Sequence, residues 1–314
     1  MKYLVTVICL TYNQEKYIEK TLNGFLKQKT TFPVEYIIRD DASTDNTANI
    51  LHEYERKYPG CFNIIYEKEN QYSKNIIPHF SQKVIMETKS KYVALCEGDD
   101  YWCDDNKLQK QVDLMEKNPL ASFCVHANYE LNDKTGKMKK RHPYKKSGVL
   151  SIEEVLIEPG GMPATCSMLM RTEYINQYPV YDLPCPVGDR SRRMFLIDKG
   201  PALYIDDLMC VYRVNNSNSF GGQLYNYNKS IKLVEEMNTF FDLYNNYTNF
   251  KYASYIKLLK EREIISHYVR FKKYDQIVKT EFYKKYYTFI DKIKLFVKWK
   301  LSPLYVIYKK KNNI

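Results

Sequence analysis

Three carboxyl side chains crowd into four residues at the end of a short apolar run. The run, Tyr92–Cys96, has the length and composition of a buried strand, and Glu97, Asp99 and Asp100 follow it. Carboxylates this close repel one another unless a cation or a donor-rich ligand lies among them. Hard oxygen ligands of this kind suit Mg²⁺ or Mn²⁺. The simpler alternative is an acidic turn that caps the helix expected from Asp105.

A second acidic turn ends another predicted strand. Asp40 and Asp41 directly follow the apolar stretch at residues 34–39, and the polar residues Thr11 and Tyr12 likewise follow the run at 3–10. Parallel strands place their carboxyl ends at one edge of a sheet, where ligands of α/β proteins bind. These turns are therefore expected to converge on one site. A polar strand terminus before a capped helix would explain Asp40 and Asp41 without a ligand.

Strands and helices alternate through the first hundred residues. Strands are expected at residues 3–10, 34–39, 62–67 and 91–96, and helices at 14–28, 46–57 and 76–88. This alternation is typical of an α/β fold with a mostly parallel sheet and right-handed crossovers. Further along, the pattern predicts strands at 121–131, 165–170, 202–206 and 209–214, and helices at 105–118, 151–157 and 189–198.

The composition changes near residue 223, so two domains are expected, at 1–222 and 223–314. Residues 225–314 hold 19 Lys and Arg against 8 Asp and Glu, which leaves 29 of each for residues 1–224 out of totals of 48 and 37. The whole net charge of +11 therefore belongs to the second segment. A basic segment favours an anionic partner, either a membrane surface or nucleic acid. Since no nucleic-acid-binding motif is present, no nucleic acid partner is expected.

A segment near the end of the expected second domain mixes aromatic side chains with lysine. Residues 282–311 place Phe, Tyr, Trp and Leu at helical spacing with lysines between them. Such a pattern is typical of a basic helix that lies in a membrane interface. An ordinary solvated helix is the alternative. We expect peripheral association with an anionic membrane surface through this segment.

Cysteine use and hydropathy indicate the compartment. The 8 cysteines are scattered without a CxxC pair, which disfavours a zinc or dithiol site and favours a reducing, cytoplasmic environment. The chain begins with a strand-like run in place of a signal peptide, and no run reaches the roughly 18 apolar residues of a membrane span. A soluble or peripheral protein is expected.

Several short motifs together resemble glycosyltransferase family 2, the inverting enzymes of the GT-A fold, of the kind that build bacterial surface polysaccharides. The resemblance covers roughly residues 3–220 and rests on these segments, in this order: Val5–Asn13, Ile37–Thr47, Tyr92–Trp102 with Asp104, Lys107–Val112, Gly188-Asp189 and Val211–Arg213. The chain departs from the family pattern at four places: Leu10 replaces a proline, Tyr72 lies near the place of a common glycine, Glu97 replaces an aspartate and Asn215 replaces a histidine.

The resemblance implies a role for each motif. Thr11, Tyr12 and Asp41 would hold the nucleotide base and ribose, with Asp40 beside them. Glu97 begins the family's acidic metal-binding triplet, in which Asp99 would be the metal ligand, and Asp100 would support the donor or the metal shell. Arg213 would lie near the diphosphate. Asp189 falls at the place of the catalytic base, which the family pattern favours over the alternative of a plain helix cap.

The resemblance further implies transfer of a sugar from a nucleotide-diphosphate donor, most plausibly UDP-linked, to a hydroxyl of a surface glycan or lipid-linked acceptor, with Mn²⁺ or Mg²⁺ as cofactor. Two other functions stay open. A nucleotidyltransferase would need a glycine-rich phosphate loop after the first strand, where Thr11, Tyr12 and Asn13 stand instead. A nucleic-acid-binding protein would use the basic second segment.

Three further features have two interpretations each. His126 is either a ligand near the acceptor or a buried neutral histidine. Tyr101 and Trp102 either stack on a sugar or anchor the acidic turn. The arginines at 190, 192 and 193 either meet an anionic acceptor or form a solvated helix face, which the pattern favours.

Overall fold

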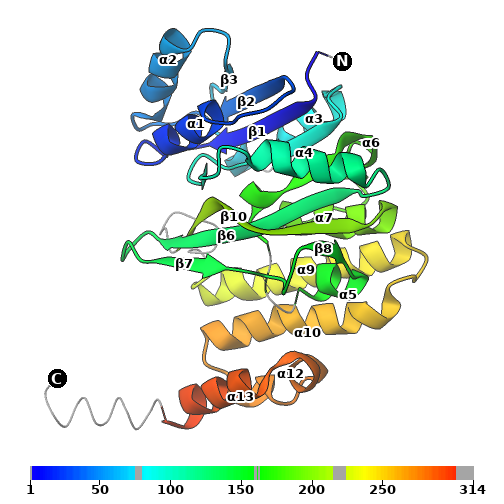
Figure 1. Ribbon diagram of the computed structural model, residues 1–314. Helices are drawn as coiled ribbons and strands as arrows, with labels where there is room; N and C mark the ends of the chain where they lie inside the picture. Colours follow the sequence, from blue (N-terminus) through cyan, green and yellow to red (C-terminus); the bar gives the residue numbers. More distant parts are fainter. Residues whose placement is uncertain (1, 75–79, 159–160, 162, 215–223, 302–314) are drawn as a thin grey trace, which may run out of the picture. The chain divides into compact units, whose positions relative to one another are not determined.

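The computed structural model of the chain describes residues 2–74, 80–158, 161, 163–214 and 224–301. Two compact units divide the chain, Met1–Asn216 and Ser217–Ile314. The boundary expected at residue 222 falls within residues 215–223, which lie outside the described residues, as do residues 302–311 of the expected interfacial helix. The first unit contains the sheet, and the second is helical (Figure 1).

The first half of the sheet has the predicted parallel arrangement. Its strands, in the spatial order β3-β2-β1-β4, are β1 (Val5–Thr11), β2 (Val34–Asp40), β3 (Asn63–Tyr66) and β4 (Tyr92–Leu95). They are connected through α1 (Ile18–Leu26), α2 (Thr47–Lys57) and α3 (Phe80–Glu87). Residues on both faces of β1 and β4 are buried, which explains why these strands read as continuous apolar runs.

The second half of the sheet is mixed. It continues from β4 in the order β9-β6-β10-β5. Its strands are β5 (Tyr101–Trp102), β6 (Phe123–Asn132), β7 (Met138–Arg141), β8 (Gly148–Leu150), β9 (Leu169–Arg171) and β10 (Ala202–Val214). The two strands predicted at 202–206 and 209–214 are one strand, β10, whose pairing with β6 shifts register between Ile205 and Cys210. The polar pair Asp206-Asp207 falls at this bulge and interrupts the apolar pattern, which is why the sequence looked like two strands.

Helices α4 (Lys107–Lys117), α5 (Ile152–Ile157), α6 (Thr172–Ile175) and α7 (Gly188–Lys199) complete the first unit.

Trp102 belongs to the core rather than to a sugar site. Its indole Nε1 donates to the Cys166 carbonyl at 2.9 Å, and its ring packs edge-on against Phe25. Trp102 therefore anchors the chain directly after the acidic turn.

The second unit is a set of helices led by an antiparallel pair, α9 (Tyr227–Tyr247) and α10 (Ala253–Arg270) (Figure 1). Apolar residues recur at helical spacing over residues 231–264 and predict one buried stripe. Its members Val234, Met237, Phe240 and Phe241 of α9 and Ile256 and Leu259 of α10 are buried, whereas Ile231, Tyr255 and Ile264 are half-buried. The shorter segments α11 (Tyr274–Ile277), α12 (Glu281–Tyr286), α13 (Phe289–Phe296) and η3 (Val297–Leu301) follow. Within the described ranges, no helix has both the length and the apolar character needed to cross a membrane.

Candidate active site

The turns after β1, β2 and β4 lie side by side at the carboxyl edge of the parallel strands. The Asp41 amide donates to the Thr11 carbonyl at 2.9 Å, and the Gly98 amide donates to the Leu10 carbonyl at 2.9 Å. Both acidic turns are thus tied to the end of β1, which is the convergence that the strand order predicts.

Gly98 allows the acidic turn to approach β1 this closely. A Cβ on Gly98 would lie 2.9 Å from both Cβ and Oγ1 of Thr11 and would collide with Gln14 Oε1. The Thr21 hydroxyl, from α1, lies 2.9 Å from the Gly98 carbonyl and 2.6 Å from the Asp100 carbonyl. The backbone of the turn is therefore fixed from inside the protein, and the carboxyl side chains are held at the edge of the sheet.

The three carboxyls of this turn are poorly solvated. Burial, followed by the neighbouring Asp99, raises the pKa of Glu97 to about 7. Burial also raises the pKa of Asp99, and it raises that of Asp100 well above the ordinary range with help from the other two carboxyls. Glu97 Oε2 and Asp100 Oδ2 are buried and lack a hydrogen-bond partner in the part of the chain that the structure describes. Carboxylate oxygens in this state suit a cation or a donor-rich ligand.

Across the described residues, no three His, Cys, Asp or Glu side chains are grouped closely enough to hold an ion by themselves. In proteins, Mg²⁺ usually takes one or two carboxylates together with substrate phosphates and water.

Arg213 connects the acidic turn to β10. Its amide donates to Asp100 Oδ1 at 2.8 Å, and its Nε donates to the Asp99 carbonyl at 2.7 Å. Its guanidinium also pairs with Asp133 at 3.4 Å and lies over the ring of Tyr17. One oxygen of Asp100 is thus occupied by the backbone of β10, so part of its role is to hold the turn in place.

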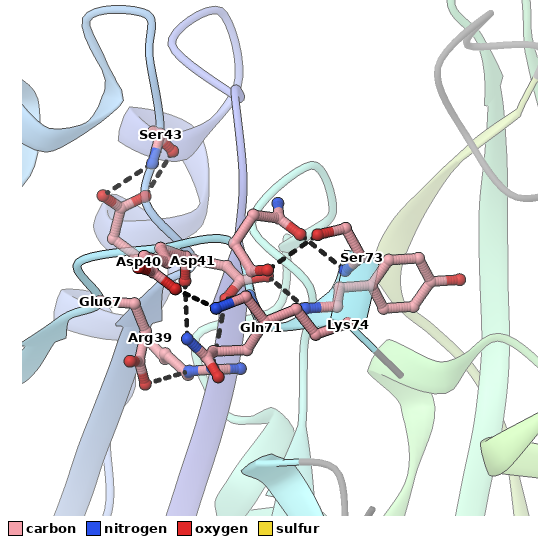
Figure 2. Close-up of polar contacts among 11 residues, drawn as sticks. Arg39, Asp40, Asp41, Ser43, Glu67, Gln71, Ser73 and Lys74 are labelled. Carbon is pink, nitrogen blue, oxygen red and sulfur yellow. Dashed lines mark hydrogen bonds and ion pairs between the residues drawn. The ribbon is translucent and has the colours of Figure 1, made fainter. Parts of the chain in front are cut away.

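Asp40 and Asp41 lie in a polar network that Figure 2 shows. Asp41 accepts hydrogen bonds from the amides of Gln71 and Tyr72, at 2.9 and 3.0 Å, and pairs with Arg39 at 3.1 Å. Asp40 accepts from the hydroxyl and the amide of Ser43. Asp41 therefore fixes the loop after β3 beside the site, which the sequence alone did not indicate.

Arg39 and Glu67 were missed by sequence reasoning. Arg39 is almost fully buried, donates from Nε to Glu67 Oε1 at 2.8 Å and stacks on the Phe80 ring. The available signal was an arginine at the end of an apolar strand, which needs an acidic partner when buried.

Asp189 lies in the first turn of α7 beside a small pocket. The pocket is lined by Asn128, Glu130, Pro163, Ala164, Thr165, Asp189 and Tyr212. Asp189 Oδ1 accepts the Arg190 amide at 2.8 Å, and Oδ2 pairs with Arg193 Nη1 at 3.0 Å. Although burial opposes it, the charge of Arg193 lowers the pKa of Asp189. Its charge also helps to raise the pKa of Glu97, so the two carboxyls interact electrostatically.

The prediction that the three arginines form a solvated helix face is wrong. Arg190 and Arg193 are buried, at 4% and 1% exposure, and Arg192 donates to the Ser81 hydroxyl at 2.8 Å. The apolar side chains that follow them, Met194 to Ile197, are buried, so the helix is covered on several sides and the arginines lie in the interior as well.

His126 is a buried neutral histidine. Its side chain is fully buried, Nδ1 lies 2.7 Å from the Ala127 carbonyl, and burial lowers its pKa well below the ordinary value. Of the residues expected to hold the nucleotide, Thr11 is buried at 3% exposure, whereas Tyr12 is 44% exposed.

The chain belongs to glycosyl transferase family 2, because a family model of that description matches residues 6–178, more than half of the 314 residues. Among curated proteins it is similar to the putative teichuronic acid biosynthesis glycosyltransferase TuaG of Bacillus subtilis. The two are 37% identical over 127 residues, which cover 40% of this chain and 48% of TuaG. The chain spans about a third to a half of the length of the curated relatives it matches.

Solved structures share the fold. TarS 1–349 of S. aureus, solved in complex with UDP-GlcNAc, superposes with a TM-score of 0.56 at 14% identity, covering 88% of this chain and 92% of that one. The mannosyltransferase PcManGT of Pyrobaculum calidifontis, in complex with GDP-Man and Mn²⁺, gives a TM-score of 0.56 at 16% identity, covering 88% and 76%. The fold is therefore the GT-A fold of glycosyltransferases.

Proposed function

We propose that this chain is a metal-dependent, inverting glycosyltransferase that moves a sugar from a UDP-linked donor to a hydroxyl of a surface glycan or lipid-linked acceptor. The observation that carries the proposal is the buried acidic turn at the sheet edge, where Glu97 and Asp100 each have a buried oxygen without a hydrogen-bond partner among the described residues, and where Glu97 interacts electrostatically with Asp189. Family membership supports glycosyl transfer over nucleotide-sugar synthesis or nucleic acid binding.

The donor would lie across the ends of β1, β2 and β4. Thr11, Tyr12 and Asp41 would contact the base and ribose, with Asp40 beside them, and Arg213 would lie near the diphosphate. Asp99 would ligate Mn²⁺ or Mg²⁺, and Glu97 and Asp100 would support the metal and the donor. The bound cation neutralises the charge that develops on the departing diphosphate.

The chain's own contribution to the chemistry centres on Asp189. Its carboxylate would accept the proton of the acceptor hydroxyl while the hydroxyl oxygen bonds to the anomeric carbon. The bond from that carbon to the diphosphate breaks as its electron pair leaves with the phosphate oxygen. Because attack and departure occur on opposite faces, the anomeric configuration inverts.

A membrane surface is the proposed location of the acceptor. Phe289, Ile293 and Phe296 of α13 are 79%, 47% and 55% exposed, and lysines lie between them at 292 and 294. An exposed aromatic face next to lysines fits the interface of an anionic membrane. This contact would keep the enzyme peripheral at the cytoplasmic face, where lipid-linked acceptors are presented.

Thermal unfolding with a panel of nucleoside diphosphates tests the donor site. Each nucleotide is measured with and without Mn²⁺ on the wild type and on Asp99→Ala. A ligand at about a hundred times its Kd stabilises by roughly 2.7 kcal/mol, so UDP with metal should raise the midpoint clearly. Asp99→Ala should remove the metal dependence. If no nucleotide shifts the midpoint under any metal, the acidic turn is only structural and the transferase proposal is wrong.

A further inference from the structure

One buried guanidinium joins two carboxylates next to the pocket. Arg193 donates from Nε and Nη2 to Glu158 Oε1 at 3.2 and 2.9 Å, and from Nη1 to Asp189 Oδ2 at 3.0 Å. The exposed fraction of the side chain is 1% for both Arg193 and Glu158, and 15% for Asp189. The two ion pairs that share Arg193 therefore form a series, Glu158–Arg193–Asp189, that runs from the interior to the pocket wall.

Local structure fixes the position of each residue in this ion-pair series. Arg193 follows Asp189 by one turn of α7, so both side chains project from the same face of the helix. Glu158 ends α5 in the left-handed backbone region, at φ 48°, which is an uncommon conformation for glutamate. A planar guanidinium has donors in a rigid fork, so holding Glu158 on one side sets the direction in which Nη1 meets Asp189.

We propose that Arg193, held in turn by Glu158, is a positioning residue for Asp189: it keeps this carboxylate ionised and oriented toward the acceptor hydroxyl. The inference rests on the proposed function, because Asp189 matters in this way only if it is the base. Each carboxylate oxygen has about two lone-pair sites. The Arg190 amide uses one on Oδ1, whereas Arg193 at 3.0 Å and the Thr165 hydroxyl at 3.4 Å both donate to Oδ2. A lone pair on Oδ1 is left for a substrate proton.

The charge around Asp189 determines its protonation state. The charged and titratable groups that face it are Arg190, Arg192 and Arg193 from its own helix, Glu97 from the turn after β4, Glu130 from β6, Tyr212 from β10 and Cys185 from the loop before α7. Arg193 makes the strongest favourable contact, and Glu158 shares that cation with Asp189. Removing Arg193 should thus raise the pKa of Asp189, whereas removing the charge of Glu158 should leave it low or lower it further.

These opposite signs give a test with full-length protein. The pH profile of kcat/KM is measured for sugar transfer by the wild type, Arg193→Met, Arg193→Lys and Glu158→Gln. Arg193→Met should move the acidic limb to higher pH and lower kcat by on the order of a hundredfold, with the KM for the donor little changed, because a misplaced reacting group costs about that much. Arg193→Lys should restore part of the loss, and Glu158→Gln should not shift the limb upward.

Two controls separate positioning from stability. Because Arg193→Met takes a cation away from the buried Glu158, the double variant Arg193→Met/Glu158→Gln removes the charge of Glu158 as well and should still show the shifted limb. Arg171→Met removes a buried arginine at the opposite end of β4, where Arg171 pairs in register with Tyr92. It should lower the unfolding midpoint and leave the pH profile unchanged.

The outcomes are distinct. If the variants lose stability while kcat/KM per folded molecule keeps the wild-type profile, Arg193 is only structural and the inference is wrong. If the limb shifts equally in Glu158→Gln and Arg193→Met, the assigned charge relationship is wrong. If wild-type protein that binds nucleotide and metal transfers no sugar and hydrolyses no donor, the proposed function itself fails.

Discussion

Lys107 and Gln111 belong to the family motif after the acidic turn, yet both side chains are fully buried. Lys107 Nζ donates to Gln111 Oε1 at 2.7 Å and lies 4.0 Å from the centre of the Trp102 ring, and Gln111 donates to the Ser167 carbonyl at 2.9 Å. Lys107 of this motif therefore packs against Trp102, and Trp102 anchors the acidic segment that precedes it. At the scale of single residues, this part of the signature is structural rather than catalytic.

Lys107 should make stability depend on pH in the alkaline range. Burial lowers its pKa from 10.5 to about 8. Between pH 8 and 10.5 the unfolded chain binds more protons at Lys107 than the folded chain does. The free energy of unfolding therefore rises with pH over this range, by roughly 3 kcal/mol in all. Urea unfolding from pH 7 to 10.5 should show the wild type gaining about this amount relative to Lys107→Met.

An exposed lysine of the same helix provides the control. Lys117→Met should change the free energy of unfolding by a similar amount at each pH in that series. A constant difference between wild type and Lys107→Met would mean that Lys107 is not held in a desolvated state.

The acidic turn is the element on which the site depends, and its closeness to β1 comes from one glycine. The amides of Cys96 and Gly98 continue the ladder to β1 beyond the last residue of β4, with bonds to the carbonyls of Ile8 and Leu10. The side chain of Thr11 occupies the space that a side chain at position 98 would need. Turn and strand are therefore packed as a unit, and displacing one displaces the carboxyls.

Gly98→Ala tests this packing. The added methyl should force the turn away from Thr11 and destabilise the fold by about 1–3 kcal/mol, the usual cost of overpacking. Nucleotide affinity in the presence of metal should fall as well, because Asp99 moves with the turn. Calorimetric unfolding and nucleotide titration measure the two effects.

A second substitution separates a loss of stability from a loss of affinity. At Gly136, in the β6–β7 turn, an added methyl meets open space but the backbone has φ 66°, so Gly136→Ala should also lower stability while leaving nucleotide affinity at the wild-type value. Wild-type stability and affinity in Gly98→Ala would show that the turn is looser than this packing implies.

At the scale of the whole molecule, the candidate site residues and the excess positive charge lie in different units. The site residues all lie in the first unit, whereas residues 225–314 carry the excess of Lys and Arg. The exposed apolar face of α13 lies in that basic part. Under the proposed function, this division would let the second unit bind a membrane surface while the first performs the reaction.

Flotation with anionic vesicles checks this division. Phe289→Ser/Ile293→Ser/Phe296→Ser should abolish most vesicle binding, and replacing Lys292 and Lys294 by Gln should weaken it by about fivefold per lysine, since each contributes about 1 kcal/mol near such a surface. Added salt should weaken the wild type similarly.

Another exposed aromatic residue supplies the control for flotation. Phe250, between α9 and α10, is 61% exposed, and Phe250→Ser should leave binding unchanged. Equal binding by the triple serine variant and the wild type would remove α13 from the proposal.

The sequence by itself determined the α/β class, the parallel half of the sheet and the meeting of the acidic turns. These follow from apolar runs of strand length, helical periodicity and the order of the strands, all of which are local or nearly local. The sequence also predicted the buried stripe of α9 and α10, since a period of 3.6 shows which face packs.

Only the tertiary structure decided which polar side chains are buried and with whom they pair. Arg193 looked like part of a solvated face, but its partner Glu158 lies 35 positions away, and that separation carries no sequence signal. The pairing of Arg39 with Glu67 and that of the Asp100 carboxyl with the Arg213 amide likewise carry no sequence signal. The continuity of β10 through its polar bulge is also visible only in the tertiary structure. Burial of a charge is decided by long-range contacts, because the cost of desolvation is offset only when a distant partner is brought within reach.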